Sequence, residues 1–138
     1  MDKKSLIEEA KILRADQARN YSCSQAALVP FAEAAGLDRE TAYRISANFG
    51  GGMRRAATCG AVTGCLMALG LCGVDDPAAV KEFHRRIKEN HEGCLECADL
   101  LRINREKGGQ KKPHCDGMVL ECVGVAADIL KEKGIISE

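Results

Sequence analysis

Helix start and stop signals recur along the whole chain, whereas the alternating apolar and polar pattern of a β-strand is nearly absent. Leu6, Ala10 and Leu13 have the i, i+4, i+7 spacing that places side chains on one face of a helix. Ser22 and Gln25 have the separation of a capping box, in which side chains and backbone at a helix start exchange hydrogen bonds. These local signals favour a helical fold.

Capping residues, glycines and prolines set the boundaries of the later helices. Thr58 is a suitable N-cap, and Asp76 before Pro77 is a strong start signal because proline fits the first helical position. Pro30 should kink or interrupt the helix that contains it. After the first helix, the predicted helices cover residues 23–35, 39–48, 59–72, 77–90, 94–104 and 116–133. We therefore predict an all-α fold, with residues 1–138 forming a single-domain bundle of about six or seven short helices.

The charge balance and the apolar segments restrict the partners of the protein. The 20 lysines and arginines balance the 20 aspartates and glutamates, and aromatic residues make up 4% of the chain, so nucleic acid is not an expected partner. Residues 56–74 form an uncharged stretch near the length that spans a bilayer, but their glycines and threonines favour a buried central helix. Because the N-terminus lacks the apolar run of a signal peptide, we expect a cytoplasmic protein without a membrane partner.

The eight cysteines indicate what chemistry the chain performs. Cys23, Cys59, Cys94 and Cys115 fall at or near predicted helix starts, where unpaired backbone N–H groups and the helix dipole favour a thiolate. The thiolate is the form of cysteine that reacts and binds metals. In a cytoplasmic protein such cysteines tend to be reduced, metal-bound or catalytic, so their positions indicate redox or metal chemistry.

The other cysteines have simpler interpretations. Cys65 and Cys72 lie on one face of a predicted helix, and we expect both to pack in the core, as we also expect for Cys122. Cys94 and Cys97 form a C-x-x-C pattern, which suits either a dithiol or half of a metal site. Because no strands surround this pattern, we do not expect a thioredoxin fold.

Gly60 and Gly64, four residues apart, share one face of the predicted central helix. Without side chains they allow either another helix or a ligand to come close, and the sequence gives these two interpretations similar weight. The three glycines at residues 50–52 support the ligand interpretation. His91 and His114 precede cysteines and could complete a mixed zinc site, but we favour exposed or capping roles for both.

The chain resembles the C_GCAxxG_C_C family, whose members are regarded as redox-active. Five segments carry the resemblance: Tyr21–Gln25, Phe49–Met53, Thr58–Gly64, Cys97–Leu101 and Cys115–Val119. The most specific segment departs from the literal family pattern, because Thr58 precedes its cysteine and Gly60 follows it. The resemblance implies electron transfer or redox sensing. It also implies that four signature cysteines correspond to Cys23, Cys59, Cys97 and Cys115.

The leading hypothesis is a redox protein in which these four cysteines converge and bind an iron–sulfur cluster, commonly one with two irons, or a zinc ion. Gly60 and Gly64 would leave room for this cofactor, and backbone N–H groups at the helix starts would hydrogen-bond the sulfurs. A second redox protein would be the partner.

Two alternatives need no metal. In the first, Cys59 is an attacking thiol of low pKa, and Cys23 or Cys97 is its resolving partner in thiol–disulfide exchange. In the second, the protein is a non-catalytic helical interaction module whose cysteines fill the core, and it forms a homodimer through the central helix. The sequence leaves open whether the protein is an enzyme.

Overall fold

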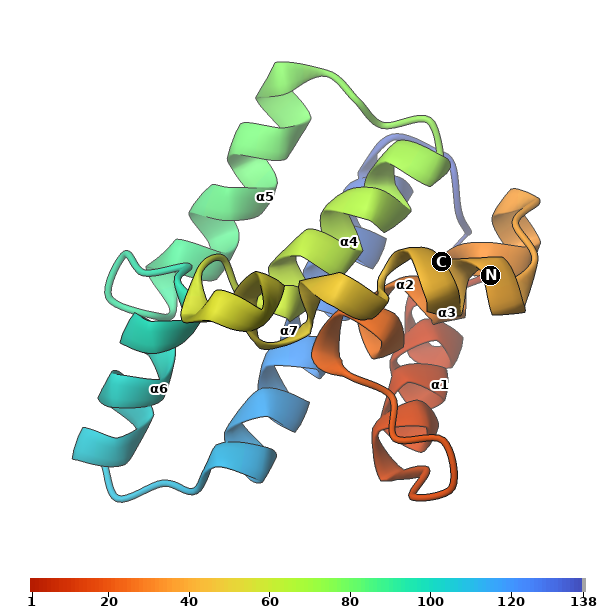
Figure 1. Ribbon diagram of the computed structural model, residues 1–138. Helices are drawn as coiled ribbons and strands as arrows, with labels where there is room; N and C mark the ends of the chain where they lie inside the picture. Colours follow the sequence, from red (N-terminus) through yellow and green to blue (C-terminus); the bar gives the residue numbers. More distant parts are fainter. Residues whose placement is uncertain (138) are drawn as a thin grey trace.

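Within residues 1–137, which the computed structural model describes, the chain folds into seven α-helices (Figure 1). In chain order the helices are α1 (Lys3–Ala15), α2 (Cys23–Ala32), α3 (Arg39–Ile45), α4 (Gly60–Leu71), α5 (Pro77–Glu89), α6 (Cys97–Glu106) and α7 (Lys111–Glu132). Short 3₁₀ segments at Glu33–Ala35 and Ala47–Phe49 follow α2 and α3. The prediction of an all-α bundle of six or seven helices is confirmed.

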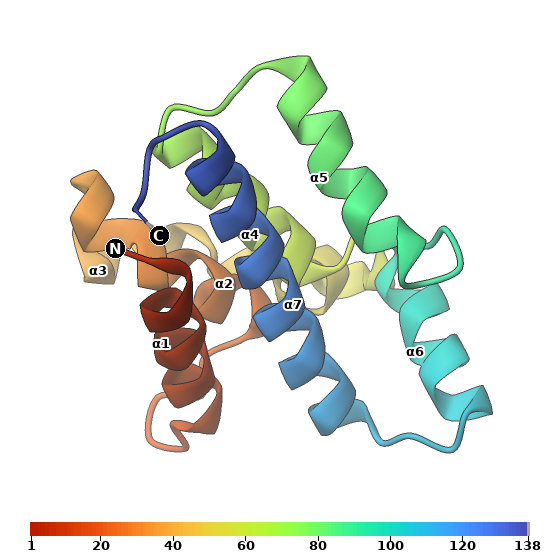
Figure 2. The ribbon, with the colours of Figure 1, turned by 180° about the vertical axis from the view of Figure 1, so that it is seen from behind.

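Helix α4 lies at the centre of the bundle because it is apolar around most of its circumference. It packs most extensively against α2 and also against α7. Helix α1 packs against both α2 and α7, and Figure 2 shows this side of the bundle from behind. Helices α5 and α6 both pack against α7. No helix among the described residues is both long enough and apolar enough to cross a membrane.

Several predicted helix starts are confirmed in detail. The Ser22 backbone N–H donates to Gln25 Oε1 at 2.9 Å, and the Gln25 backbone N–H donates to Ser22 Oγ at 3.4 Å, which completes the capping box of α2. Asp76 accepts from the Ala79 backbone N–H at 3.1 Å, and Pro77 is the first residue of α5. The residues predicted to form one face of the first helix are all buried: Leu6, Ala10 and Leu13.

Two helix boundaries near α2 and α4 differ from the prediction. Helix α2 continues through Pro30 as far as Ala32 and only then tightens into a 3₁₀ segment, so the proline does not interrupt it. Thr58 is not the N-cap of α4, because it pairs with Glu96 in an isolated antiparallel bridge. Cys59 occupies the N-cap position instead, without a side-chain capping bond.

The starts of α6 and α7 also differ from the prediction. Helix α6 begins at Cys97 rather than Cys94, because Glu92 and Gly93 have positive φ and turn the chain before the helix. Helix α7 begins at Lys111, five residues earlier than predicted. Its third residue is Pro113, a position at which the backbone N–H has no acceptor within the helix, so the proline is tolerated there.

Residues 51–56, which we call the left-handed turn, connect the 3₁₀ segment after α3 to residues 57–59, which precede α4 (Figure 1). Positive φ values of 58° to 65° occur at Gly51, Gly52, Met53, Arg54 and Ala56. The glycines adopt this conformation freely, whereas each of the other residues is strained by about 1–2 kcal/mol. The sequence predicted backbone freedom at the glycines, but the continuation into non-glycine residues was not predicted.

Candidate functional site

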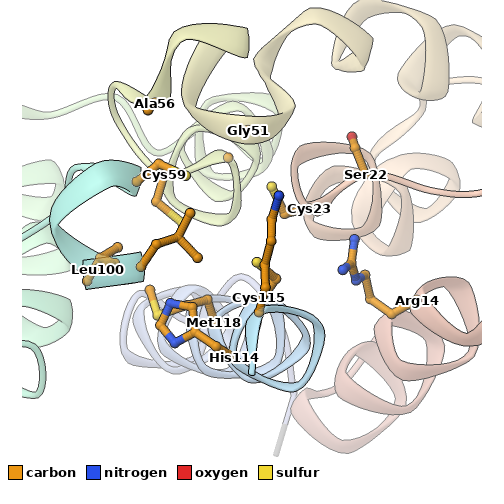
Figure 3. A pocket seen from close by; sticks show the side chains of 14 residues that line it. Arg14, Ser22, Cys23, Gly51, Ala56, Cys59, Leu100, His114, Cys115 and Met118 are labelled. Atoms are coloured by element: carbon orange, nitrogen blue, oxygen red, sulfur yellow. The ribbon is translucent and has the colours of Figure 1, made fainter. Parts of the chain in front are cut away.

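The four cysteines that the family resemblance selects line one cavity of about 330 Å³: Cys23, Cys59, Cys97 and Cys115. Figure 3 shows this cavity, with Gly51 and Ala56 of the left-handed turn on one side and His114 and Met118 on the other. Other residues of its lining include Arg14, Ser22, Gly60, Leu100, Leu101 and Lys111. The cysteines come from the N-terminal parts of four different helices, so residues far apart in the sequence meet here.

Cys23 is placed by the capping box of α2, which fixes it as the first residue of that helix. Cys59 and Cys97 are held by the backbone bridge between their loops. The Cys59 N–H donates to the Leu95 carbonyl at 2.9 Å, and the Cys97 N–H donates to the Ala57 carbonyl at 2.6 Å. This pairing brings the starts of α4 and α6 together, and no sequence signal had indicated it.

Cys115 reaches the cavity in a different way from the other three cysteines. It is the fifth residue of α7 rather than a helix-start residue, because α7 begins at Lys111. The expectation that its thiol lies at the positive end of a helix dipole is therefore wrong. Burial raises the pKa of the Cys115 thiol, and the positive charges of Arg14 and Lys111 oppose this shift without cancelling it.

The two glycines of α4 have different surroundings. Gly60 lines the cavity, and a Cβ atom built on it would lie 2.4 Å from Cys23 Sγ, so its lack of a side chain leaves room for that thiol. Gly64 is not among the residues lining the cavity. A Cβ atom there would lie 2.5 Å from the Ser24 carbonyl oxygen and 2.8 Å from Ala27 Cβ. Gly64 thus allows the close approach of α2 and α4, which is the packing interpretation.

Burial makes the cavity thiols hard to ionise. Cys59 is 7% exposed, and its burial raises the pKa of its thiol to about 12, with a further contribution from a negative charge on Cys23. Backbone N–H groups of Ala61 and Val62 point at the Cys59 sulfur and oppose the shift, but burial outweighs them. The prediction that Cys59 is a thiol of low pKa is therefore wrong.

Cys23 faces the other three cysteines of the cavity. Burial raises the pKa of the Cys97 and Cys115 thiols, and in both cases a charge on Cys23 is the next largest cause. The same charge is the second cause at Cys59. A charge on Cys23 thus acts on all three other cavity thiols, and a charge on Cys97 also acts on Cys59 and Cys115.

The four sulfurs line the cavity without meeting at a single point. No three His, Cys, Asp or Glu side chains within residues 1–137 are grouped closely enough to hold one metal ion. A structural zinc ion needs four donors at about 2.0–2.3 Å from one centre. All eight cysteines are free thiols. The arrangement can therefore support disulfide formation or the binding of a group larger than one ion.

The remaining cysteines lie outside the cavity lining. Cys65 and Cys122 are fully buried, which confirms the prediction that they pack in the core. Cys72 is half-buried against the core at the end of α4. Cys94 lies in the loop before α6, where its Sγ is 3.7 Å from the Glu92 carbonyl oxygen. The C-x-x-C pattern is thus split, with only Cys97 at the cavity.

Of the three histidines, only His114 lies at the cysteine cavity. His91 Nε2 lies 2.7 Å from Glu121 Oε1, so this ring is already engaged with a carboxylate. His114 lines the cavity, but it is not part of any group that could hold a metal ion among the described residues. The sequence did not single out Arg14 or Lys111, since isolated cations carry no recognisable motif; only the tertiary structure places them at the thiols.

The fold and the cavity define the class of protein: an all-α bundle in which four cysteines from four helices surround one cavity. The family described as "Putative redox-active protein (C_GCAxxG_C_C)" matches residues 21–129. The chain belongs to this family, as its sequence motifs had indicated. No curated protein and no solved structure matches the chain.

Proposed function

We propose that this protein is a redox protein whose four cavity cysteines hold an iron–sulfur cluster for electron transfer or redox sensing. One observation carries the proposal: Cys23, Cys59, Cys97 and Cys115, from four helices, line a single cavity of about 330 Å³. Four cysteine thiolates are the usual ligands of such clusters. Membership of a family described as redox-active agrees with this assignment.

The residues of the cavity fit a cluster better than a single ion. A cluster contains several irons, so its cysteine ligands do not have to meet at one atom. The four cysteines share the cavity but form no group that could hold one ion among the described residues, which supports the proposal of a larger group. When bound, an iron–sulfur cluster supplies a one-electron redox couple.

The chain itself supplies shielding, hydrogen bonds and positive charge. Burial of Cys59 keeps water away from its sulfur, and the backbone N–H groups of Ala61 and Val62 point at that atom. Arg14 and Lys111 line the cavity and offset negative charge on the thiolates. Hydrogen bonds and charge near the sulfurs are the protein's main means of tuning a redox potential.

Anaerobic purification followed by iron and sulfide analysis and visible spectroscopy tests the proposal. We expect iron and sulfide in the native protein, and we expect Cys23→Ser or Cys97→Ser to lose most of both. The matched control is Cys94→Ser, three residues from Cys97 but outside the cavity, which should retain them. Native protein without iron, sulfide or visible absorbance would refute the cluster, and so would equal losses in the Cys94 and Cys97 variants.

A metal-free dithiol is the second candidate, favoured by the four free thiols that line one cavity. One thiolate would attack the disulfide of an oxidised partner protein and form a mixed disulfide, releasing one partner thiol. The second thiol would then displace the other partner thiol, so the partner gains the two electrons and two protons that the new disulfide gives up. The raised pKa of Cys59 leaves Cys23 as the attacking thiol in this scheme, with Cys59 as its partner. Redox titration with mass spectrometry would detect a Cys23–Cys59 disulfide in protein that contains no iron.

A further inference from the structure

Arg54 and Arg55 are exposed cations that lack an intramolecular ion pair with any described carboxylate. This distinguishes them from most arginines of the protein. Six of the other eight arginines make ion pairs with glutamates or aspartates: Arg14, Arg19, Arg39, Arg85, Arg86 and Arg102. Within the described chain, Arg44 and Arg105 are the other two without such a pair. Because the formal net charge of the chain is zero, two adjacent unpaired arginines make a local excess of positive charge.

These two arginines lie beside the cysteine cavity. They belong to the left-handed turn, whose residues Gly51 and Ala56 line the cavity, as Figure 3 shows. Lys111, at the start of α7, lines the same cavity and is also exposed. It too has no ion pair with a carboxylate of the described chain. We call Arg54, Arg55 and Lys111 the cationic rim.

Nearby acidic residues do not neutralise the cationic rim. Asp116 is engaged by Arg14 at 2.7 Å and by Lys112 at 3.1 Å. Asp99 is 4.0 Å from Arg102. Glu96, which pairs with Thr58 beside the turn, is exposed, and its carboxylate offsets one charge of the cationic rim. The cavity therefore opens on a surface with a positive excess.

The left-handed turn presents its side chains at a cost in backbone energy. Met53 and Arg54 have φ of 59° and 58°, and Met53 is 40% exposed. Strained backbone of this kind clusters at functional sites, where it fixes how a side chain is presented. Arginine and methionine are also among the residues enriched in protein interfaces. An exposed Met53 next to two unpaired arginines matches that composition.

We propose that the cationic rim is the docking surface for an acidic face of a redox partner protein. This inference rests on the proposed electron-transfer function, because docking there would bring the partner's redox group next to the cysteine cavity. Exposed charges of this kind speed association and set orientation more than they add affinity, and salt screens them. We therefore expect a weak, salt-sensitive complex that forms over the cavity.

A binding experiment tests the surface independently of electron transfer. The native protein is titrated into a fluorescein-labelled glutamate-rich peptide, and anisotropy reports the affinity. The double variant Arg54→Gln/Arg55→Gln should bind about fivefold more weakly at low salt. The control Lys4→Gln/Lys81→Gln removes two exposed charges from α1 and α5, outside the cavity lining, and should bind like the native protein. Equal affinity of the two double variants would overturn the proposal.

A competition experiment separates an acidic protein from nucleic acid. Unlabelled glutamate-rich peptide should displace the labelled peptide more effectively than a DNA duplex of equal charge, because no aromatic residue lies on the cationic rim to stack on bases. Stronger displacement by DNA would overturn the assignment to an acidic protein.

Electron transfer to small oxidants of opposite charge supplies the kinetic test. Each reduced site loses one electron, and ferricyanide, an anion, is reduced to ferrocyanide, while hexaammineruthenium(III) serves as the cationic oxidant. The arginine double variant should react about fivefold more slowly with ferricyanide but no more slowly with the ruthenium complex. Its iron content should equal that of the native protein. If neither oxidant reacted with the reduced native protein, electron transfer would be refuted. If both oxidants reacted and the arginine double variant matched the native rate with ferricyanide, the cationic rim would be refuted.

Discussion

Replacing Gly64 by alanine tests the close contact between α2 and α4. The new Cβ atom would lie 2.5 Å from the Ser24 carbonyl oxygen and 2.8 Å from Ala27 Cβ. Both distances are below van der Waals contact, and the first atom is backbone, so the two helices must move apart. Overpacking of this kind costs about 1–3 kcal/mol, while the helix propensity of alanine returns up to about 1 kcal/mol. We expect a net loss of stability of about 1–2 kcal/mol.

Gly70 provides a matched control on the same helix. It is exposed, and a Cβ atom there meets nothing within 4 Å. Gly70→Ala should therefore gain about 0.5–1 kcal/mol from helix propensity alone. Urea unfolding of reduced protein, followed by circular dichroism, gives the midpoints and slopes for both variants. If Gly64→Ala were as stable as Gly70→Ala, the close approach of α2 and α4 would be wrong.

Gly60→Ala extends the same comparison to the cavity. Its Cβ atom would lie 2.4 Å from Cys23 Sγ, so the thiol has to move. We expect the rate of Cys23 alkylation in metal-free protein, measured by mass spectrometry, to change in this variant. It should stay native-like in Gly70→Ala and in the folded fraction of Gly64→Ala. An unchanged Cys23 rate in Gly60→Ala would contradict the contact between this glycine and the thiol.

Two further predictions concern strain and pH. Arg54→Gly should raise the free energy of unfolding by about 1 kcal/mol, because glycine adopts a φ of 58° without strain. Arg55 has a φ of −137°, so Arg55→Gly should give no such gain. Thermal melts compare the two variants, and a gain in both would contradict the strain argument. The stability of reduced, metal-free protein should fall as the pH rises from 9 to 12, because burial raises the pKa of the Cys59, Cys65 and Cys122 thiols. The folded state retains the Cys59 proton up to a pKa of about 12, while the unfolded chain releases it near 9.0. Cys59→Ser should weaken this fall in urea titrations at each pH, and an unchanged fall would assign it to other groups.

Local signals predicted most helix starts but not the irregular connections. The capping box at Ser22 and the Asp76–Pro77 start depend on neighbouring residues alone, so they could be read directly from the chain. Thr58 has equally good capping chemistry, yet a bridge to a residue 38 positions away takes it out of the helix. The left-handed turn extends beyond its glycines because residues distant in the sequence also act on it: its contacts with α6 help to hold it.

The residues of the candidate site were likewise predicted only in part. Helix-start position alone selected Cys94, whereas the resemblance to the family selected Cys97, and only Cys97 lines the cavity. Gly60 and Gly64 were indistinguishable in the sequence, because both lie on one helix face. The structure separates them, since Gly60 faces Cys23 and Gly64 faces the backbone of α2.

The sequence by itself determined the all-α class and, through its family pattern, the four cysteines of interest. Helix propensity, caps and motif spacing act between close neighbours in the chain, so the sequence alone contains them. Only the tertiary structure decided that these cysteines share a cavity, that Arg14 and Lys111 face them, and that the Cys59 thiol resists ionisation. Burial and electrostatic coupling depend on residues far apart in the sequence, and packing of the whole bundle sets both.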